Sequence, residues 1–331
     1  MEVEKQYIKL NVERYGGMIF SPWFDRPLSV AGRVIIKNPS TGKLESRLVN
    51  VDRDLVMIPN LAIHMNREVN NGYKYNAQKD MLPLYGMSTA KDTFMQTIAE
   101  AAGVSVDDIL GHDLFLYNRE RASIWGASEE FVSAPQLDDL QCAFSSMKGF
   151  LSSEKNNYLA LHCVFDNEEV GSGTKQGAAS TFLKDTLRRI NDGLSRTYEE
   201  YLMTLAGSFM ISADNAHALH PNYIEKADPV NRPLPNGGIV IKYNANQKYC
   251  TDAVSAAKFK DLCDRAGVKY QTFVNRSDVP GGSTLGNISN TQVPMNTVDI
   301  GLPQLAMHSP YETAGVEDTG SFIRAAEEFF R

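Results

Sequence analysis

Apolar residues in the first part of the chain fall into short runs that turn-forming residues separate. The runs at 7–14, 29–37 and 48–58 are rich in β-branched and aromatic residues, which favours strands. Gly-Gly at 16–17, Asn-Pro at 38–39 and Asp-Arg at 52–53 divide them. One stretch, at 91–102, has the apolar spacing of a helix instead. The pattern therefore predicts a strand-rich region that a single helix interrupts.

The pattern changes near residue 130, where helical and strand-like periods begin to alternate. The predicted helices lie at 139–150, 178–191, 197–206, 252–266 and 318–330. The predicted strands lie at 158–165, 209–212, 238–243, 269–274 and 297–300. Such alternation is typical of a three-layer α/β domain, with a sheet between helices. We expect two domains, a strand-rich one over residues 1–128 and an α/β one over residues 129–331.

The composition indicates a folded protein with a sizeable core. Of the 331 residues, 43% are hydrophobic and 22% are charged, which is unlike a disordered chain. A formal net charge of −7, with scattered Lys and Arg, disfavours a nucleic-acid surface. No apolar run reaches the roughly 20 residues of a membrane span, and the start lacks the pattern of a signal peptide. We expect a cytoplasmic enzyme with four free thiols and with neither nucleic-acid nor membrane partners.

Adjacent carboxylates directly follow the predicted strand at 158–165. Glu168 and Glu169 repel each other and lose solvation if they are buried, so their proximity calls for a partner. A metal ion provides one, because one carboxylate can bind it while the neighbour handles a proton of water. The alternative is a solvated charged loop, and this is how we interpret the pair at 327–328 on the last predicted helix.

Three more segments carry acids or histidine where an apolar run gives way to polar residues. They lie at 136–139, 212–217 and 303–309. In α/β proteins, functional sites are built at the ends of strands, where such transitions occur. The four segments together therefore favour one metal-dependent site over four unrelated loops.

These segments closely resemble the motifs of the M18 aminopeptidases, the group of aspartyl aminopeptidase and aminopeptidase I. The matching motifs lie at 166–171, 212–223 and 303–308, and the resemblance continues through 23–26, 58–64 and 240–244. It therefore covers nearly the whole chain, and 134–142 is similar to the bacterial aminopeptidase I branch. The resemblance implies a metal-dependent aminopeptidase that releases N-terminal residues from peptides. It also implies a strand-rich dimerisation domain and a homo-oligomer, a dodecamer in the family.

The resemblance further implies two zinc ions in each subunit. Asp138 matches the carboxylate that bridges both ions, and Glu169 and His308 match the other protein ligands of one ion. Asp214 matches a ligand of the second ion, and Glu168 matches the general base. Carboxylates and neutral imidazole are residue types that suit zinc. For the acid at 166 two roles stay open, orienting a ligand or capping the turn that follows.

Substrate recognition is implied at four further positions. His64 matches a histidine that reaches into the neighbouring subunit's active site and stabilises the tetrahedral intermediate, and His217 matches a position near the substrate. Lys242 and Tyr249 match positions that line the pocket for the N-terminal side chain. A buried ammonium there would favour Asp or Glu, so acidic N-terminal residues are slightly favoured. The alternatives are a Lys242 that simply reaches solvent, and a preference for neutral residues, as in the aminopeptidase I branch.

The chain departs from the family pattern at one point. The family's first metal ligand is a histidine in a His-x-Asp-Ser-Pro type segment, and none of the six histidines here lies in that context. We therefore expect the chain to be a fragment, a split-gene product or an inactive form. In each case we expect the second zinc ion to bind weakly, because it lacks its imidazole ligand. The alternative function is that of a truncated or inactive homologue that serves as an assembly or scaffold subunit.

Overall fold

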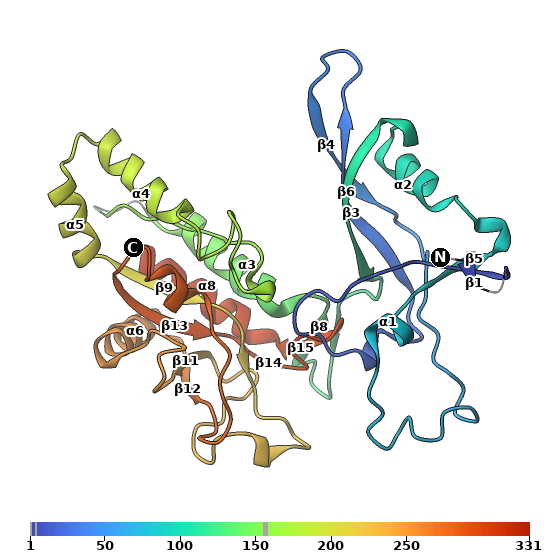
Figure 1. Ribbon diagram of the computed structural model, residues 1–331. Coiled ribbons are helices and arrows are strands. Elements are labelled where there is room, and N and C mark those ends of the chain that lie inside the picture. The colour runs from blue at the N-terminus through green and yellow to red at the C-terminus, as the bar shows by residue number, and fades with distance from the viewer. Residues whose placement is uncertain (1, 4, 155–157) are drawn as a thin grey trace. The chain divides into compact units, whose positions relative to one another are not determined.

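The computed structural model describes residues 2, 3, 5–154 and 158–331, and the chain divides into two compact units (Figure 1). Unit 1 comprises Met1–Arg121 together with Ser309–Tyr311. Unit 2 comprises Ala122–His308 together with Glu312–Arg331. The chain thus leaves unit 2 after His308 and re-enters it at Glu312.

Unit 1 consists of two three-stranded antiparallel sheets and short helices. One sheet has the order β4-β3-β6 and the other the order β1-β2-β5. The strands are β1 (Glu2–Val3), β2 (Tyr7–Lys9), β3 (Leu28–Lys37), β4 (Leu44–Asn50), β5 (Leu84–Met87) and β6 (Ile109–Asn118), and the helices are α1 (Ala77–Asp80) and α2 (Phe94–Ala102). Leu28, Val34 and Ile98 are fully buried in the core of this unit.

Several predicted bounds in unit 1 are wrong. The strand expected at 7–14 is only the short β2, and β4 begins and ends earlier than the predicted run at 48–58. Strand β6 was not predicted, because Gly111, His112 and Asp113 interrupt its apolar run and glycine and aspartate are depleted in strands. These residues nevertheless form a strand, because they pair with β3 over almost the full length of both strands.

Unit 2 is built around a four-stranded mixed sheet of order β12-β11-β13-β9. Its strands are β9 (Phe209–Ala213), β11 (Ile239–Tyr243), β12 (Tyr270–Val274) and β13 (Asn296–Gly301). Strands β9 and β13 are parallel, and so are β11 and β12, whereas β11 and β13 are antiparallel. The apolar side chains of β11 and β13 are buried, apart from the half-buried Tyr243, whereas those of β9 and β12 are only half-buried.

A second sheet in unit 2 has five strands in the order β10-β14-β15-β8-β7. The strands are β7 (Ser123–Trp125), β8 (Phe131–Ala134), β10 (Ala216–His217), β14 (Pro303–Leu305) and β15 (Glu312–Gly315). The parallel pair β9 and β13 continues into the parallel pair β10 and β14, with breaks at 214–215 and at 302. The first break holds the polar residues Asp214 and Asn215, and beside it the buried Leu302 accepts a hydrogen bond from the Ala216 N–H through its carbonyl oxygen.

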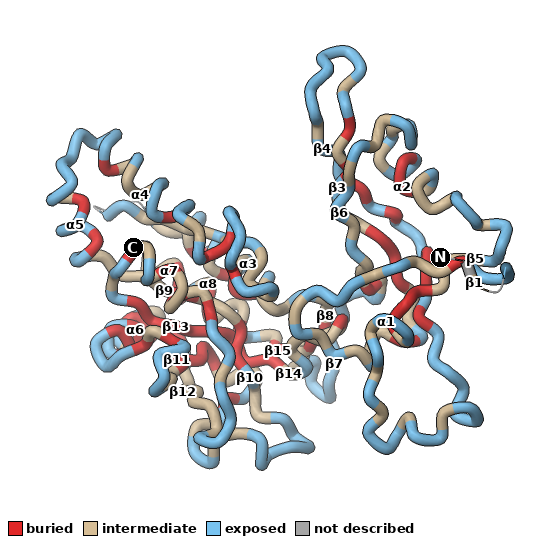
Figure 2. The backbone as a smooth tube through the Cα atoms, in the orientation of Figure 1, coloured by how far each residue is buried: buried red, intermediate tan, exposed pale blue. Residues whose placement is uncertain are grey.

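Helices cover the apolar side chains of the four-stranded sheet. The helices of unit 2 are α3 (Leu137–Ser152), α4 (Phe182–Gly193), α5 (Tyr198–Gly207), α6 (Ala253–Ala266), α7 (Leu285–Ser289) and α8 (Val316–Phe330). Phe259 on α6 and Phe322 on α8 pack with Ile239 and Ile300 of the sheet, and all four are at most 1% exposed. Figure 2 shows the buried residues gathered along β11, β13 and the adjoining helices. The mixed α/β class predicted from the sequence is confirmed.

The predicted strand at 158–165 is wrong. These residues form no strand and follow the end of α3 as an irregular segment. Tyr158, Leu159 and Val164 are 81%, 63% and 62% exposed, whereas Leu161, Cys163 and Phe165 are partly buried against the apolar cluster of α4 and α5. A strand exists only with a hydrogen-bonded neighbour, and none of the described strands pairs with this segment. His162 in this segment is half-buried, and its Nε2 forms a hydrogen bond with Ser146 Oγ at 3.0 Å.

The other predicted elements of unit 2 agree with the structure to within a few residues, whereas the short elements β7, β8, β10, β14, β15 and α7 were not predicted. The largest difference is at α4, which begins at Phe182 rather than at 178. Among the described residues, no helix combines the length and the apolar character needed to cross a membrane.

Candidate metal centre

Three residues that are far apart in sequence bring ligand atoms together in unit 2. Asp138 lies in the first turn of α3, Glu169 in a short 3-10 helix (Glu168–Val170), and His308 in the turn after β14. His308 Nε2 is 3.4 Å from Asp138 Oδ2 and 3.2 Å from Glu169 Oε2. Ligands placed about 2 Å from a tetrahedral zinc ion lie roughly 3.3 Å from one another. The spacing therefore fits a single ion held by all three side chains.

A second group shares Asp138 and adds Asp139 and Asp214. One carboxylate oxygen from each of the three lies within 4.8 Å of the others. Asp139 follows Asp138 through a cis peptide bond, and Asp214 lies at the break between β9 and β10. We did not single out Asp139 from the sequence, although its place in an adjacent acid pair was the available signal. Asp138 is common to both groups, as expected for a bridging carboxylate.

Residues with left-handed backbone lie at or within two positions of the candidate ligands. Gln136, Asn167, Ala306 and His308 have φ values of 59°, 61°, 58° and 67°. For residues other than glycine such conformations cost on the order of 1 kcal/mol each and persist only where surrounding contacts hold them. The chain is therefore strained at the segments that deliver the candidate ligands, which is typical of functional sites.

Burial and crowding raise the pKa of the carboxylates. Burial and, to a smaller extent, Asp138 and Glu168 raise the pKa of Asp214 to about 7, although Lys242 lowers it. The pKa of Asp139 lies well above its ordinary value, because the side chain is buried beside Asp214 and Asp138. A cation bound between these groups would displace the protons and replace the repulsion by attraction.

Glu168 belongs to neither group of candidate ligands. Burial, followed by the charges of Glu169 and Asp138, raises the pKa of Glu168 above its ordinary value. A carboxylate that accepts a proton more readily is better suited to act as a general base near neutral pH. Burial and Asp138 also raise the pKa of Glu169.

Glu312, at the start of β15, holds the backbone of two candidate ligands. Its Oε2 accepts a hydrogen bond from the Asp138 N–H at 2.8 Å, and its Oε1 accepts one from the His308 N–H at 2.7 Å. The residue is 2% exposed, and burial raises its pKa to about 7 although these hydrogen bonds act in the opposite direction. Sequence reasoning missed Glu312, whose partner at 138 lies 174 residues away.

Asn215 connects the segments from a second side. Its backbone N–H donates to Asp139 Oδ1 at 3.1 Å, and its Nδ2 donates to Leu137 O at 3.0 Å and Gln304 Oε1 at 2.9 Å. Gly301, on the adjacent strand β13, leaves room for this break, because a Cβ at that position would overlap the carbonyl oxygen of Asp214. Asn215 was also missed from the sequence, since only the fold brings its partners together.

Lys242 is buried within the same network and is only 2% exposed. Its Nζ donates to Asn215 O at 2.8 Å, lies 3.6 Å from Asp214 Oδ2 and is 5.5 Å from the ring centroid of Tyr249. Burial alone would lower the pKa of Lys242, but the charges of Asp214 and of other nearby groups outweigh it, and the pKa is raised. The alternative in which Lys242 reaches solvent is therefore wrong.

His217 and His64 lie in different units. His217 lies on β10, and although part of the residue is exposed, its imidazole lies beside Phe273, with the two ring centroids 6.0 Å apart. Desolvation, followed by the charge of Lys242, lowers the pKa of His217 and favours the neutral imidazole. His64 lies in an irregular, exposed segment of unit 1.

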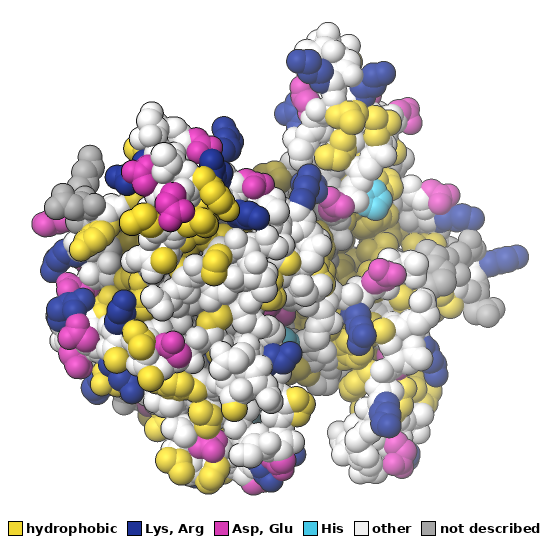
Figure 3. Space-filling model, turned by 60° about the vertical axis from the view of Figure 1, so that its left-hand side comes forward, with side chains coloured by type: hydrophobic (Ala, Val, Ile, Leu, Met, Phe, Trp, Pro, Cys, Tyr) yellow, Lys and Arg dark blue, Asp and Glu magenta, His cyan; other side chains and the backbone are white. Residues whose placement is uncertain are grey.

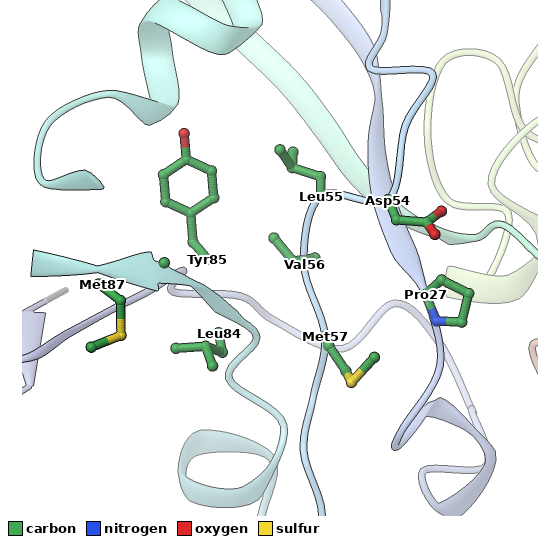
Figure 4. Close-up of a pocket in the computed structure, with 9 residues that line it drawn as sticks. Pro27, Asp54, Leu55, Val56, Met57, Leu84, Tyr85 and Met87 are labelled. Carbon is green, nitrogen blue, oxygen red and sulfur yellow. The ribbon is translucent and has the colours of Figure 1, made fainter. Parts of the chain in front are cut away.

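The pocket shown in Figure 4 carries no comparable chemistry. It has a volume of about 380 Å³ and is lined by residues of unit 1, among them Val56, Met57 and Tyr85. Its acid, Asp54, forms an ion pair with Arg119 at 2.8 Å. None of the candidate ligands lines this pocket.

The family model described as aminopeptidase I zinc metalloprotease (M18) matches residues 1–330. The chain belongs to the M18 family. A relative from Clostridium acetobutylicum, described as a probable M18 family aminopeptidase 2, is 48% identical over 334 residues. That match covers 100% of this chain and 77% of the relative. Membership of the M18 family makes the chain a zinc metalloaminopeptidase by descent, as its motifs predicted.

Several solved structures have the same fold as this chain. A chain in the structure of the Ape4 and Nbr1 complex has a TM-score of 0.93 and 36% identity, over 98% of this chain and 66% of that one. A chain in the structure of the S. cerevisiae mApe1 dodecamer has a TM-score of 0.81 and 28% identity, over 98% of this chain and 73% of that one. The present chain thus spans about two thirds to three quarters of these proteins.

The donor set fits the zinc that the M18 family description names. The first group offers two carboxylates and one imidazole, which zinc binds well, whereas calcium and magnesium prefer oxygen ligands alone. The second group offers carboxylates only, and a lysine ammonium lies against one of them. The first group is therefore the better zinc site.

Proposed function

We propose that this chain is a metal-dependent aminopeptidase that releases the N-terminal residue of peptides by means of two zinc ions. The observation that carries the proposal is the meeting of Asp138, Glu169 and His308 at zinc-ligand spacing in a chain of the M18 family. Asp138, Asp139 and Asp214 would hold the second ion, with Asp138 bridging the two. When bound, zinc polarises a carbonyl group and lowers the pKa of water.

Glu168 is the general base in this proposal. It is next to a ligand but is not one itself, and its raised pKa suits it to take a proton from water and pass it to the leaving amine. His217 follows Asn215 by two residues on β10, and its lowered pKa favours a neutral imidazole that can accept a hydrogen bond from substrate or donate one to it.

The second ion binds more weakly than the first in this proposal. The ion pair between Lys242 and Asp214 must weaken before the Asp214 carboxylate can coordinate a metal ion. Since the second group also has no imidazole, its ligands match zinc less well than those of the first group.

The pocket for the N-terminal side chain lies, we propose, beside Lys242 and Tyr249. An Asp or Glu side chain would gain a charge-assisted hydrogen bond from the ammonium, which neutral side chains do not. The ammonium already faces Asp214, so the expected preference for acidic residues is modest.

We also propose that the protein is a cytoplasmic homo-oligomer in which His64 completes the active site of a partner subunit. The related mApe1 structure is a dodecamer, which supports self-association. All four cysteines are free thiols, which suits a reducing compartment.

The test compares two neighbouring acids. Glu168→Gln should reduce kcat about 10²–10⁴-fold and leave the zinc content unchanged, because the amide keeps the shape and removes the base. Glu169→Gln should instead reduce zinc affinity, and Glu199→Gln, an exposed acid on α5, should change neither quantity. Zinc content and peptide hydrolysis are measured on the same preparations. Zinc binding without hydrolysis in the wild type would favour the scaffold alternative, and near-native kcat in Glu168→Gln would refute the role of the base.

A further inference from the structure

We infer that Glu312 is a positioning residue that sets the zinc affinity of the first site by fixing the backbone of two of its ligands. The inference rests on the proposed function, since it assumes that Asp138 and His308 bind zinc. Each carboxylate oxygen of Glu312 accepts a hydrogen bond from the backbone N–H of one candidate ligand. The N···O distances are 2.8 Å for Asp138 and 2.7 Å for His308. One carboxylate thus joins the start of α3 to the turn after β14.

The joined segments need an external support. His308 has a left-handed backbone, and the residues at Asp138 and Asp139 depart from helical geometry within α3. Both segments thus depart from regular backbone geometry at the residue that carries the ligand. A strained backbone relaxes unless contacts hold it, and a shift of about 1 Å would spoil the 3.4 Å approach of the two ligand side chains.

Glu312 is itself rigidly placed. It is the first residue of β15, pairs with Ala134 of β8 and is 2% exposed. A buried carboxylate is costly unless its oxygens are satisfied, and here the two backbone donors satisfy them. Glu312 is therefore stably buried only while the backbone N–H groups of Asp138 and His308 point at its two oxygens.

Asp318, on α8, provides a matched control. It is a fully buried carboxylate whose oxygens accept backbone N–H groups from Asn236 at 2.7 Å and Gly238 at 3.0 Å. Asp318 thus has the same chemistry as Glu312 but supports segments without candidate ligands. A purely structural role for Glu312 predicts that the two acids behave alike.

The experiment compares Glu312→Gln with Asp318→Asn in the full chain. In Glu312→Gln an amide N–H₂ replaces one acceptor and faces a backbone N–H, so one ligand segment loses its support. Zinc affinity is measured by competition with a chromophoric chelator, after circular dichroism has shown that each variant is folded. We expect Glu312→Gln to weaken the tighter zinc site about 10–100-fold, the usual effect of losing a group that orients a ligand. Asp318→Asn should lower the melting temperature and keep the wild-type zinc affinity.

A spectrum separates positioning from loss of stability. With Co²⁺ as the probe, the ligand-field bands should change in Glu312→Gln and stay the same in Asp318→Asn. If Glu312→Gln does not fold, Glu312→Asp, whose shorter side chain reaches only one donor, takes its place. Equal zinc affinities in all variants, or equal losses in both, would overturn the inference. Absence of zinc binding in the wild type would overturn the proposed function itself, whereas loss of kcat in Glu168→Gln tests that function independently.

Discussion

At the scale of single residues, the candidate centre combines acids that were visible in the sequence with supports that were not. Adjacent acids after an apolar run pointed to Glu168 and Glu169, and the family motifs pointed to Asp138, Asp214 and His308. Sequence reasoning does not reveal Glu312 or Asn215, because each acts on backbone groups that are distant along the chain. The sequence left open whether Lys242 is buried or reaches solvent, because this depends on how β11 is covered.

Asp318 carries a prediction about pH. Burial raises the pKa of Asp318 from 3.8 to about 6, although its backbone hydrogen bonds act in the opposite direction. The folded state therefore holds the proton more tightly than the unfolded state, and the stabilisation present below pH 4 is lost as the pH rises through about 6. The difference corresponds to about 3 kcal/mol at most.

The measurement is urea unfolding of the wild type and of Asp318→Asn between pH 4 and 8, in the presence of a chelator. The free energy of unfolding of the wild type relative to the variant should fall with rising pH through this window. Parallel curves for the two proteins would contradict the raised pKa.

At the scale of elements, the prediction succeeded where local signals determine the structure. Helix α6 begins where Asp252 caps it, and helix α5 begins with a capping box formed by Thr197 and Glu200. The prediction failed at 158–165, since a strand depends on a neighbour that the run itself does not specify. Strand β6 was not predicted for a related reason. Polar residues interrupt its apolar pattern, and only its pairing with β3 in the folded protein makes it a strand.

Gly301 carries a prediction at this scale, because β13 lies close to the break between β9 and β10 at this residue. A methyl group at this position would overlap the carbonyl oxygen of Asp214. Gly301→Ala should therefore lower the free energy of unfolding by about 1–3 kcal/mol and reduce the affinity of the second group of ligands for its metal ion. Gly193→Ala is the control, because a methyl group meets nothing within 4 Å there and the position is helical. Equal stability of the two variants, measured by urea unfolding, would show that β13 can move aside.

At the scale of the whole molecule, the two units divide the candidate residues between them. Every candidate metal ligand lies in unit 2, whereas His64 lies in unit 1. On the face shown in Figure 3, basic and acidic side chains are interspersed with apolar ones. The sequence predicted a strand-rich part and an α/β part, and whether 1–128 and 129–331 fold as separate domains remains a prediction.

The role of His64 is tested by mixing subunits. Glu168→Gln lacks the base and His64→Phe lacks the imidazole, so each homo-oligomer should have low kcat. If His64 acts in a partner's site, mixed oligomers contain some sites with an intact Glu168 and an intact His64. Mixing should then restore part of the wild-type peptide hydrolysis. Subunit exchange, followed by fluorescence transfer between labelled variants, is the control, and exchange without recovered activity would make His64 a structural residue.

The path of the chain through residues 308–312 limits how this protein can be divided. Ser309–Tyr311 belongs to unit 1, whereas the residues on either side belong to unit 2. No single cut therefore yields two intact pieces, because a fragment that starts at 122 takes these three residues away from unit 1. Pro310 would lose the hydrogen bond from Asn118 at 3.1 Å, and Tyr311 the bond to the carbonyl of Arg121 at 2.8 Å. A recombination event that exchanged unit 1 between relatives would likewise have to exchange a three-residue segment nearly 200 positions downstream.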